Sequence, residues 1–421
     1  MRRFALLSVV LLSAGQARAE ASDVFEKFAE RVVQVRVLEK GSGSKSVIGS
    51  GFFVSADGLV ITNYHVVSSL VFQPSDFTVE LHDSGGNALA AKVVDVDVVH
   101  DLAILKSETP PPSFFTLEPI QPNRGARLYS LGNPHDVGFS ILEGTYNGII
   151  AESLYEHVHF SGSLNGGVSG GPTLDDKGRV VGINVSSYGD QLSFLVPVKF
   201  ARELYDRVQA SPHREAPLLE RVREDLAANQ ERVSKLLLDA KTATTRLGPW
   251  ELPGRWLPQL REWADRSKEN EPTRRYRWTS YGARSEDSVY LSRGDYTGTV
   301  ALTHMLFEPD GANRVQLFRQ AGQTYFSHQT LSIGEEAEPS PATTRWKCRD
   351  AVLKQNGTRL KAVICLRAYK QLAGLYEALV RYLALDEPDK TVVGELTLTG
   401  FSVANVEAIS RRFLGAVAWK P

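Results

Sequence analysis

The stretch SGFFVSADGLVITNYHVV, residues 50–67, combines two short apolar runs with a polar turn and ends beside a histidine. The turn is Asp57-Gly58, and an Asp-Gly pair between β-type segments is a strong hairpin signal. Similar short runs, separated by glycines and polar turns, recur between residues 32 and 198. This spacing predicts an all-β unit, either an antiparallel barrel or a sandwich. Helical patterns are expected only at residues 23–31 and after residue 199.

Length and composition indicate a soluble multidomain protein. A chain of 421 residues is too long for one ordinary hydrophobic core. Hydrophobic residues make up 42% and charged residues 23%, which is typical of globular proteins. The 48 basic residues balance 49 acidic ones, which argues against a nucleic-acid partner.

The N-terminus has the pattern of a secretory signal peptide, residues 1–19. Arg2 and Arg3 precede a short apolar run, and small residues lead to a cleavage site after Ala19. The alternative is an uncleaved membrane anchor, but the run is far shorter than the roughly 20 residues that a spanning helix needs. We therefore expect export to the periplasm or secretion.

The two cysteines, Cys348 and Cys365, flank a hairpin signal at Asn356-Gly357. A two-residue turn there pairs Gln355 with Thr358, and the same register places the cysteines opposite each other. At such a position the Cα atoms lie about 4.5 Å apart when the pair is not hydrogen-bonded, within reach of a disulfide. We expect a disulfide, which suits an exported protein. The alternative is two free buried thiols.

A helical stripe follows the β-type region. Its positions alternate steps of three and four residues, as in a heptad repeat. They are Leu219, Val222, Leu226, Asn229, Val233, Leu236 and Ala240. The stripe either oligomerises the chain as a short coiled coil or packs on its own protein. We expect residues 213–272 to form a helical connector.

Residues 273–421 mix strand and helix patterns, so an α+β domain of unknown function is expected there. Residues 369–385, YKQLAGLYEALVRYLAL, have helical periodicity, and so do residues 406–417. TVVGELTLTG, residues 391–400, is typical of a strand. No catalytic or ligand motif is evident in this part.

The octapeptide NGGVSGGP, residues 165–172, surrounds Ser169 with small or turn-forming residues. Glycines allow sharp turns and let a substrate carbonyl approach the backbone. Such a loop could be only a structural turn. A serine hydrolase also needs a base and a carboxylate that orients it.

His65 is the candidate base and Asp101 the candidate carboxylate. His65 follows an apolar strand, where a lone histidine is often just packed. Asp101 directly precedes the apolar run 102–105, which would bury its side chain. A buried carboxylate needs a partner. Asp95 and Asp97 compete for the carboxylate role. His100 competes for the role of base.

Together these stretches resemble the trypsin-like serine endopeptidases, most closely the bacterial HtrA (DegP-like) branch. Residues 50–67 resemble that branch's histidine segment, and DVVHDLAILK, residues 97–106, resembles its aspartate segment. LNGGVSGGPTLDDKGRVVGIN, residues 164–184, resembles its nucleophile loop and the hairpin that follows. The resemblance extends over residues 24–208, within a protease domain placed at 20–212.

The resemblance implies two six-stranded β-barrels with an active site between them. Ser169 would be the nucleophile, His65 the base and Asp101 the residue that orients it. The amides of Gly167 and Ser169 would form the oxyanion hole. The fold class expected for the chain is thus a double-barrel protease domain, a helical connector and an α+β domain.

The sequence departs from that family in three places. Val168 stands where the HtrA branch usually has Asn, and a β-branched residue stiffens the loop. Ser163, at the floor of the implied specificity pocket, is uncharged, and Leu195 and Val196 match a pocket wall. We therefore expect preference for small or medium apolar residues. No PDZ domain is recognisable after the protease segment.

The function expected is an exported serine endopeptidase that acts on proteins or peptides. The alternatives are a protease-like module that binds peptides without cutting them and an oligomeric scaffold built on the helical stripe. No cofactor is expected, because metal-ligand spacings and a phosphate-binding loop are both missing from the sequence. The C-terminal domain could bind an envelope or extracellular partner.

Overall fold

The structure is a computed structural model of the chain. It describes residues 21–133, 138–187, 192–211, 217–241, 243–267, 275–327, 342–387 and 389–420. The expected signal peptide, residues 1–19, lies outside the described residues. No described helix is both long enough and apolar enough to cross a membrane.

The first barrel follows the N-terminal helix α1 (Ala21–Phe28) and a 3₁₀ turn. Six antiparallel strands close it in the order β1-β2-β3-β6-β5-β4. They are β1 (Val32–Glu39), β2 (Lys45–Phe53), β3 (Leu59–Thr62), β4 (Phe77–His82), β5 (Ala88–Asp97) and β6 (Leu102–Ser107). The predicted turn at Asp57-Gly58 joins β2 to β3, with Gly58 at a φ of 92°. Helix α2 (Tyr64–Phe72), which the sequence analysis missed, follows β3.

The second barrel is also closed, with the order β10-β11-β12-β9-β8-β7. Its strands are β7 (Arg127–Gly132), β8 (Ser140–Ile149), β9 (Val158–Phe160), β10 (Pro172–Leu174), β11 (Val180–Ser187) and β12 (Ser193–Pro197). Helix α3 (Val198–Ala210) follows it and packs in one core cluster with residues of both barrels, including Ile104 and Leu131. The expected double barrel is confirmed.

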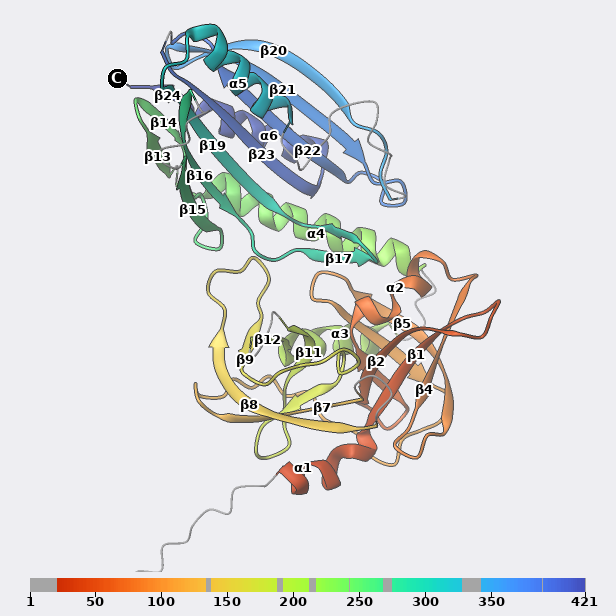
Figure 1. Cartoon of the computed structure of the whole chain (residues 1–421). Coiled ribbons are helices and arrows are strands. Elements are labelled where there is room, and N and C mark those ends of the chain that lie inside the picture. The colour runs from red at the N-terminus through yellow and green to blue at the C-terminus, as the bar shows by residue number, and fades with distance from the viewer. Residues whose placement is uncertain are drawn as a thin grey trace, which may run out of the picture.

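The helical stripe lies on one long helix, α4 (Leu218–Asp239), between the barrels and the C-terminal sheet (Figure 1). Val222, Leu226 and Val233 are buried in a core cluster that contains residues of the first barrel and of the C-terminal sheet. Most of the stripe therefore packs on its own protein, with Leu236 exposed, which favours the second of the two interpretations.

The C-terminal part is built on a seven-stranded antiparallel sheet, in the order β15-β16-β19-β23-β22-β21-β20. Its strands are β15 (Arg261–Arg266), β16 (Tyr276–Arg284), β19 (Val300–Pro309), β20 (Lys347–Gln355), β21 (Thr358–Ala368), β22 (Tyr376–Ala384) and β23 (Thr391–Phe401). Strands β13 (Thr244–Leu247), β14 (Trp250–Pro253) and β24 (Ala418–Trp419) form a small second sheet. Strands β17 (Val289–Ser292) and β18 (Asp295–Thr297) form a separate hairpin.

Helices cover both faces of the large sheet. Helix α5 (Arg314–Ser327) packs on Phe307, Leu383 and Val393. Helix α6 (Val403–Gly415) lies on the other face, beside α4, and Ser402 caps its first turn by accepting from Asn405 N at 3.3 Å. Figure 1 shows α5 and α6 on either side of the sheet.

Two expectations for this part are wrong. Residues 376–384, expected to be helical, form β22, whose side chains are buried on both faces. A strand covered on both faces is apolar throughout and loses the alternation that distinguishes it from a helix. The boundary at residue 273 also does not match the sheets, because β15 pairs with β16 and β14 pairs with β24.

The hairpin register predicted from Asn356-Gly357 is observed. Gln355 pairs with Thr358 and Cys348 with Cys365, whose Cα atoms lie 4.0 Å apart. The two cysteines form a disulfide in the structure.

Candidate active site

His65 lies in the first turn of α2, directly after β3, and the backbone there is held by Asp101. The Asp101 carbonyl accepts hydrogen bonds from Tyr64 N at 3.1 Å and from Asn63 Nδ2 at 2.8 Å. Asp101 has a φ of 54°, in the left-handed region, which aspartate tolerates better than most residues. This conformation turns the chain just before β6.

The Asp101 carboxylate makes two bonds to His65. Its Oδ1 accepts from the His65 amide at 2.8 Å, and its Oδ2 lies 2.7 Å from His65 Nδ1. A carboxylate can only accept here, so Nδ1 carries the proton and Nε2 of the neutral ring is left as an acceptor. This is the tautomer that a general base requires.

The environment of His65 contains opposing influences on its pKa. Burial alone would lower the pKa, but the charge and the hydrogen bond of Asp101 outweigh it, so the pKa of His65 lies above its ordinary value. The His65 side chain is 27% exposed, so the imidazole is partly buried but still accessible to solvent.

The competing residues are engaged elsewhere. His100 Nδ1 lies 2.7 Å from Asp97 Oδ2, and its ring stacks on Phe200 of α3 at 3.6 Å between centroids. Asp95 pairs with Arg207 of α3 at 2.8 Å. His65 and Asp101 form the pair that lies on a segment adjoining the Ser169 loop.

The loop that carries Ser169 is clamped to β2 of the first barrel. Ser50 Oγ donates to Gly167 O at 2.7 Å, and Ser50 N donates to Ser169 O at 2.7 Å. A Cβ at Gly170 would lie 2.2 Å from Ser50 O, so only glycine fits this approach. The loop therefore lies against β2, the strand that pairs with β3, and His65 directly follows β3.

Asn184 of β11 holds the same loop from the second barrel. Its Nδ2 donates to Val168 O at 3.1 Å and to Leu131 O at 3.2 Å, and its backbone carbonyl accepts from Gly170 N at 2.8 Å. Sequence analysis did not single out Ser50 or Asn184. The only signal was that each is a polar residue inside an apolar strand run.

The Ser169 hydroxyl donates to Val185 O at 2.9 Å. Within the described part of the chain, no hydrogen bond joins it to His65. The two residues lie on adjoining segments, since a Cβ at Gly170 would also lie 2.9 Å from Asn63 N. The hydroxyl is thus bonded to the backbone of β11 and not to the imidazole in this structure.

The amides of Gly167 and Ser169 donate to no protein acceptor among the residues that the structure describes. Gly167 has a φ of 94°, a conformation that glycine adopts without strain. The side chain of Val168 is buried in the core of the second barrel, against Gly132. Valine at this position is therefore a packing residue.

The three residues assigned to a substrate pocket lie in different surroundings. Ser163 is exposed. Leu195 is 0% exposed and Val196 is 1% exposed, and they belong to two separate core clusters. Their burial does not support a role as a pocket wall. On a strand of a closed barrel, such buried apolar side chains pack in hydrophobic cores and do not line an open pocket.

A residue of the C-terminal part also lies beside His65. The ring of Tyr290, on β17, makes an edge-to-face contact with the imidazole, with centroids 5.9 Å apart. Sequence analysis missed this residue, because nothing local links a tyrosine at position 290 to a histidine at position 65. Among the described residues there is no cluster of His, Cys, Asp or Glu that could hold a metal ion.

Comparisons with known proteins find similarity to trypsin-like peptidases and to serine proteases of the HtrA/DegP kind. The profile of the family "Trypsin-like peptidase domain" matches residues 49–183, a segment that includes His65, Asp101 and Ser169. A "Probable periplasmic serine endoprotease DegP-like" of Brucella suis is 32% identical over 172 residues, which are 38% of this chain and 32% of that protein. "Serine protease HTRA1B" of Danio rerio is 30% identical over 207 residues, 44% of this chain and 41% of that protein.

A solved serine endoprotease from Yersinia pestis is 21% identical and has a TM-score of 0.40. It covers 47% of this chain, and the match takes in 69% of that structure. The chain spans about a third of the length of the DegP-like relatives it matches, 32% for the Brucella protein. All of these similarities fall on less than half of the chain.

Proposed function

We propose, from the trypsin-like peptidase domain that residues 49–183 carry and its likeness to HtrA/DegP serine proteases, that the protein is a serine endopeptidase. Ser169 would attack the scissile carbonyl, His65 would take its proton, and Asp101 would hold the imidazole tautomer. The observation that carries the proposal is the pairing of Asp101 Oδ2 with His65 Nδ1 at 2.7 Å, beside the glycine loop of Ser169.

The chemical steps require one rearrangement of the nucleophile. Ser169 Oγ would leave Val185 O and turn toward His65 Nε2, which is free to accept its proton. A staggered rotamer change of this kind is fast compared with typical turnover. The proton would then pass from His65 to the leaving amine, and water would hydrolyse the acyl-enzyme by the reverse path.

The developing oxyanion would be bound by the amides of Gly167 and Ser169. The hydrogen bond from Asn184 to Val168 O holds the peptide plane that contains the Ser169 amide before substrate arrives, and the bond from Ser50 to Gly167 O holds the preceding peptide plane of the loop. A donor set arranged in advance avoids reorganisation in the transition state, and one such donor is typically worth on the order of 10²–10³ in turnover.

Probe labelling tests the proposal. A fluorophosphonate should modify Ser169, and the full chain should cleave casein, whereas Ser169→Ala should do neither. Ser75→Ala is the matched control, because Ser75 lies on an exposed turn and its hydroxyl donates to the neighbouring Asp76 carboxylate at 2.7 Å. If folded wild-type protein neither reacts with the probe nor cleaves casein, the endopeptidase proposal is wrong.

A second candidate is a protease-like module that binds peptides without cutting them. The bond between Ser169 Oγ and Val185 O favours it, because the hydroxyl is not aligned with the base. This candidate predicts that wild type and Ser169→Ala capture the same peptides and that neither hydrolyses them.

The remaining expectations are proposals that rest on the endopeptidase. Export, to the periplasm or outside the cell, is supported by the N-terminal sequence pattern and by the periplasmic name of the DegP-like relatives. Preference for small or medium apolar residues is supported by the uncharged Ser163. Proteins or peptides are the proposed substrates, the C-terminal part is a candidate surface for an envelope partner, and no cofactor is required.

A further inference from the structure

The hairpin formed by β17 and β18 lies across the active-site region. Tyr290, on β17, contacts the ring of His65, and Ser68, one turn further along α2, lies close enough to the Tyr290 hydroxyl to act on its pKa. Ser68 Oγ in turn donates to the His65 carbonyl at 3.3 Å. The tyrosine thus contacts the side chain of His65 and lies beside Ser68, which bonds to the His65 backbone.

The rest of β17 follows the same helix. Tyr64, which is fully buried, donates from its hydroxyl to Leu291 O at 2.9 Å, and its ring lies 6.4 Å from that of Tyr290. Tyr64 N is itself bonded to Asp101 O. The first turn of α2 is therefore held on one side by Asp101 and on the other by β17.

The hairpin is also attached to the second barrel. Asp287, two residues before β17, accepts a hydrogen bond from Ser153 in the β8–β9 loop. After β18, Gly298 O accepts from the Tyr155 hydroxyl at 2.8 Å. The hairpin consequently bonds to both barrels, on either side of its contact with α2.

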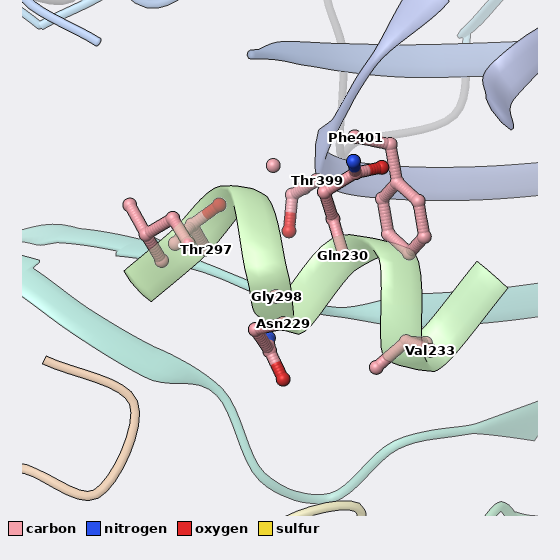
Figure 2. Close-up of a pocket in the computed structure, with 9 residues that line it drawn as sticks. Asn229, Gln230, Val233, Thr297, Gly298, Thr399 and Phe401 are labelled. Carbon is pink, nitrogen blue, oxygen red and sulfur yellow. The ribbon is translucent and has the colours of Figure 1, made fainter. Parts of the chain in front are cut away.

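Helix α4 supports the second of these attachments. Asn229 Nδ2 donates to the Tyr155 hydroxyl at 3.1 Å. Figure 2 shows Asn229 near Thr297 and Gly298, where α4 and the end of the hairpin line a narrow pocket. Gly298 has a φ of 72°, and a Cβ there would lie 2.3 Å from the Tyr155 hydroxyl. This attachment requires glycine.

We propose that the C-terminal hairpin is part of the active site and that Tyr290 is a positioning residue for His65. This inference rests on the proposed endopeptidase function and assigns it a residue outside the matched domain. Tyr290 restricts rotation of the imidazole while Nδ1 faces Asp101, which leaves Nε2 as the acceptor. Because proton transfer depends steeply on geometry, freeing the ring lowers turnover more than substrate binding.

Variants of the full chain test the role of Tyr290. Tyr290→Leu should lower kcat by about 10- to 100-fold with KM changed less than about twofold, the scale expected for a small misplacement. Tyr290→Phe keeps the ring contact and should restore most of kcat. Equal kcat in Tyr290→Leu and wild type, or loss confined to KM, would overturn the proposal.

A second pair of variants loosens the hairpin without touching α2. Gly298→Ala clashes with the Tyr155 hydroxyl and should reduce kcat in the same direction as Tyr290→Leu. Gly311→Ala is its matched control, with a φ of 82° and no atom within 4 Å of the added Cβ. If the two glycine variants have equal kcat, the hairpin does not position the site.

A readout without catalysis separates this inference from the proposed function. In the Ser169→Ala background, NMR of the His65 ring should show a changed pKa and broadened resonances for Tyr290→Leu but not for Tyr290→Phe. Unchanged ring resonances would refute the positioning role even if the enzyme is active. Changed resonances in a protein whose wild type neither labels nor cleaves would leave the role of Tyr290 standing and remove the endopeptidase.

Discussion

Asp101 both orients His65 and shapes the backbone that presents it. Its carboxylate binds the amide and Nδ1 of His65, while its carbonyl binds Tyr64 and Asn63. The left-handed φ of 54° makes these contacts compatible. One residue thus fixes the position, the tautomer and the pKa of the candidate base.

Replacing Asp101 with Asn should reduce kcat by about 10⁴-fold, because the amide NH₂ would favour the wrong imidazole tautomer. The pKa of His65 should also fall, since burial lowers it once the charge of Asp101 is gone. Activity requires neutral His65, so the acidic limb of the kcat/KM profile should move to lower pH. The measurement is a pH profile of residual hydrolysis.

The matched control is Asp97→Asn, which breaks a carboxylate–histidine pair of the same 2.7 Å length at His100. His100 stacks on Phe200 and does not face the nucleophile loop. This variant should keep the acidic limb of the wild-type profile. A comparable loss of turnover in both variants would mean that the effect is a general one on the β5–β6 turn.

At the scale of elements, the nucleophile loop depends on strands of both barrels. Ser50 of β2 is fully buried. Its hydroxyl donates a hydrogen bond to Gly167 O at 2.7 Å and accepts one from Asn133 N at 2.9 Å. The side chain of Asn184 on β11 donates hydrogen bonds to Val168 O and Leu131 O. The loop conformation is therefore set by buried polar side chains as well as by its glycines.

Ser50→Ala should lower the free energy of unfolding by about 1–3 kcal/mol, the cost of leaving a buried polar group without its partner. It should also slow fluorophosphonate labelling, because the loop loses the bond that holds the Gly167 carbonyl beside Ser169. Ser130→Ala is the matched control, since its buried Oγ has no hydrogen-bond partner among the described residues. Equal melting temperatures and labelling rates in both variants would contradict the prediction.

The sequence predicted those elements whose signals are local. The Asp57-Gly58 turn, the strands around it and the Asn356-Gly357 register follow from turn chemistry and alternation. Strand β22 was mistaken for a helix because both of its faces are buried. Helix α2 was missed because it is only nine residues long and mostly apolar, so its sequence lacks a clear polar face.

The candidate site divides in the same way. His65, Asp101 and Ser169 were predicted from motif stretches, whereas the contacts of Tyr290 and the clamps of Ser50 and Asn184 exist only after distant segments meet. The rotamer of Ser169 could not be predicted from the sequence either, because it depends on Val185 O of a neighbouring strand.

At the scale of the whole molecule, one hydrophobic core cluster runs from the first barrel through α4 into the C-terminal sheet. A cluster of charged residues also lies where α4 meets the first barrel and α3. Arg207 of α3 lies 2.8 Å from Asp95 Oδ2 and 3.7 Å from Asp225 Oδ1, and Arg221 of α4 lies 3.3 Å from Asp95 Oδ1. Asp97, paired with His100, lies close enough for its charge to act on Asp225.

The carboxyl of Asp225 belongs to this cluster, but only one of its oxygens lies near an arginine. Burial, followed by the charge of Asp97, raises the pKa of Asp225 to about 7 against the opposing effect of Arg207. Its buried Oδ2 has no hydrogen-bond partner among the described residues, which also disfavours the charged form. In the unfolded chain the carboxyl has its ordinary pKa near 4.

The folded protein therefore holds a proton on Asp225 that the unfolded chain releases. This group makes the free energy of unfolding fall as the pH rises from about 4 to about 7, and the full penalty remains above that range. Asp225→Asn should remove a penalty on the order of 1–3 kcal/mol at pH 8 and change little at pH 4. The measurement is thermal unfolding of wild type and variant at both pH values.

Asp239→Asn is the control on the same helix, because Asp239 is exposed at the end of α4 and pairs with Lys235. Its melting temperature should follow that of wild type at both pH values. A melting temperature of Asp225→Asn at pH 8 equal to or below that of wild type would show that Asp225 is ionised in the fold and held by Arg207. The joint between the barrels and the C-terminal sheet would then be a stable ion-pair network at neutral pH, and its docking would weaken on acidification instead of on raising the pH.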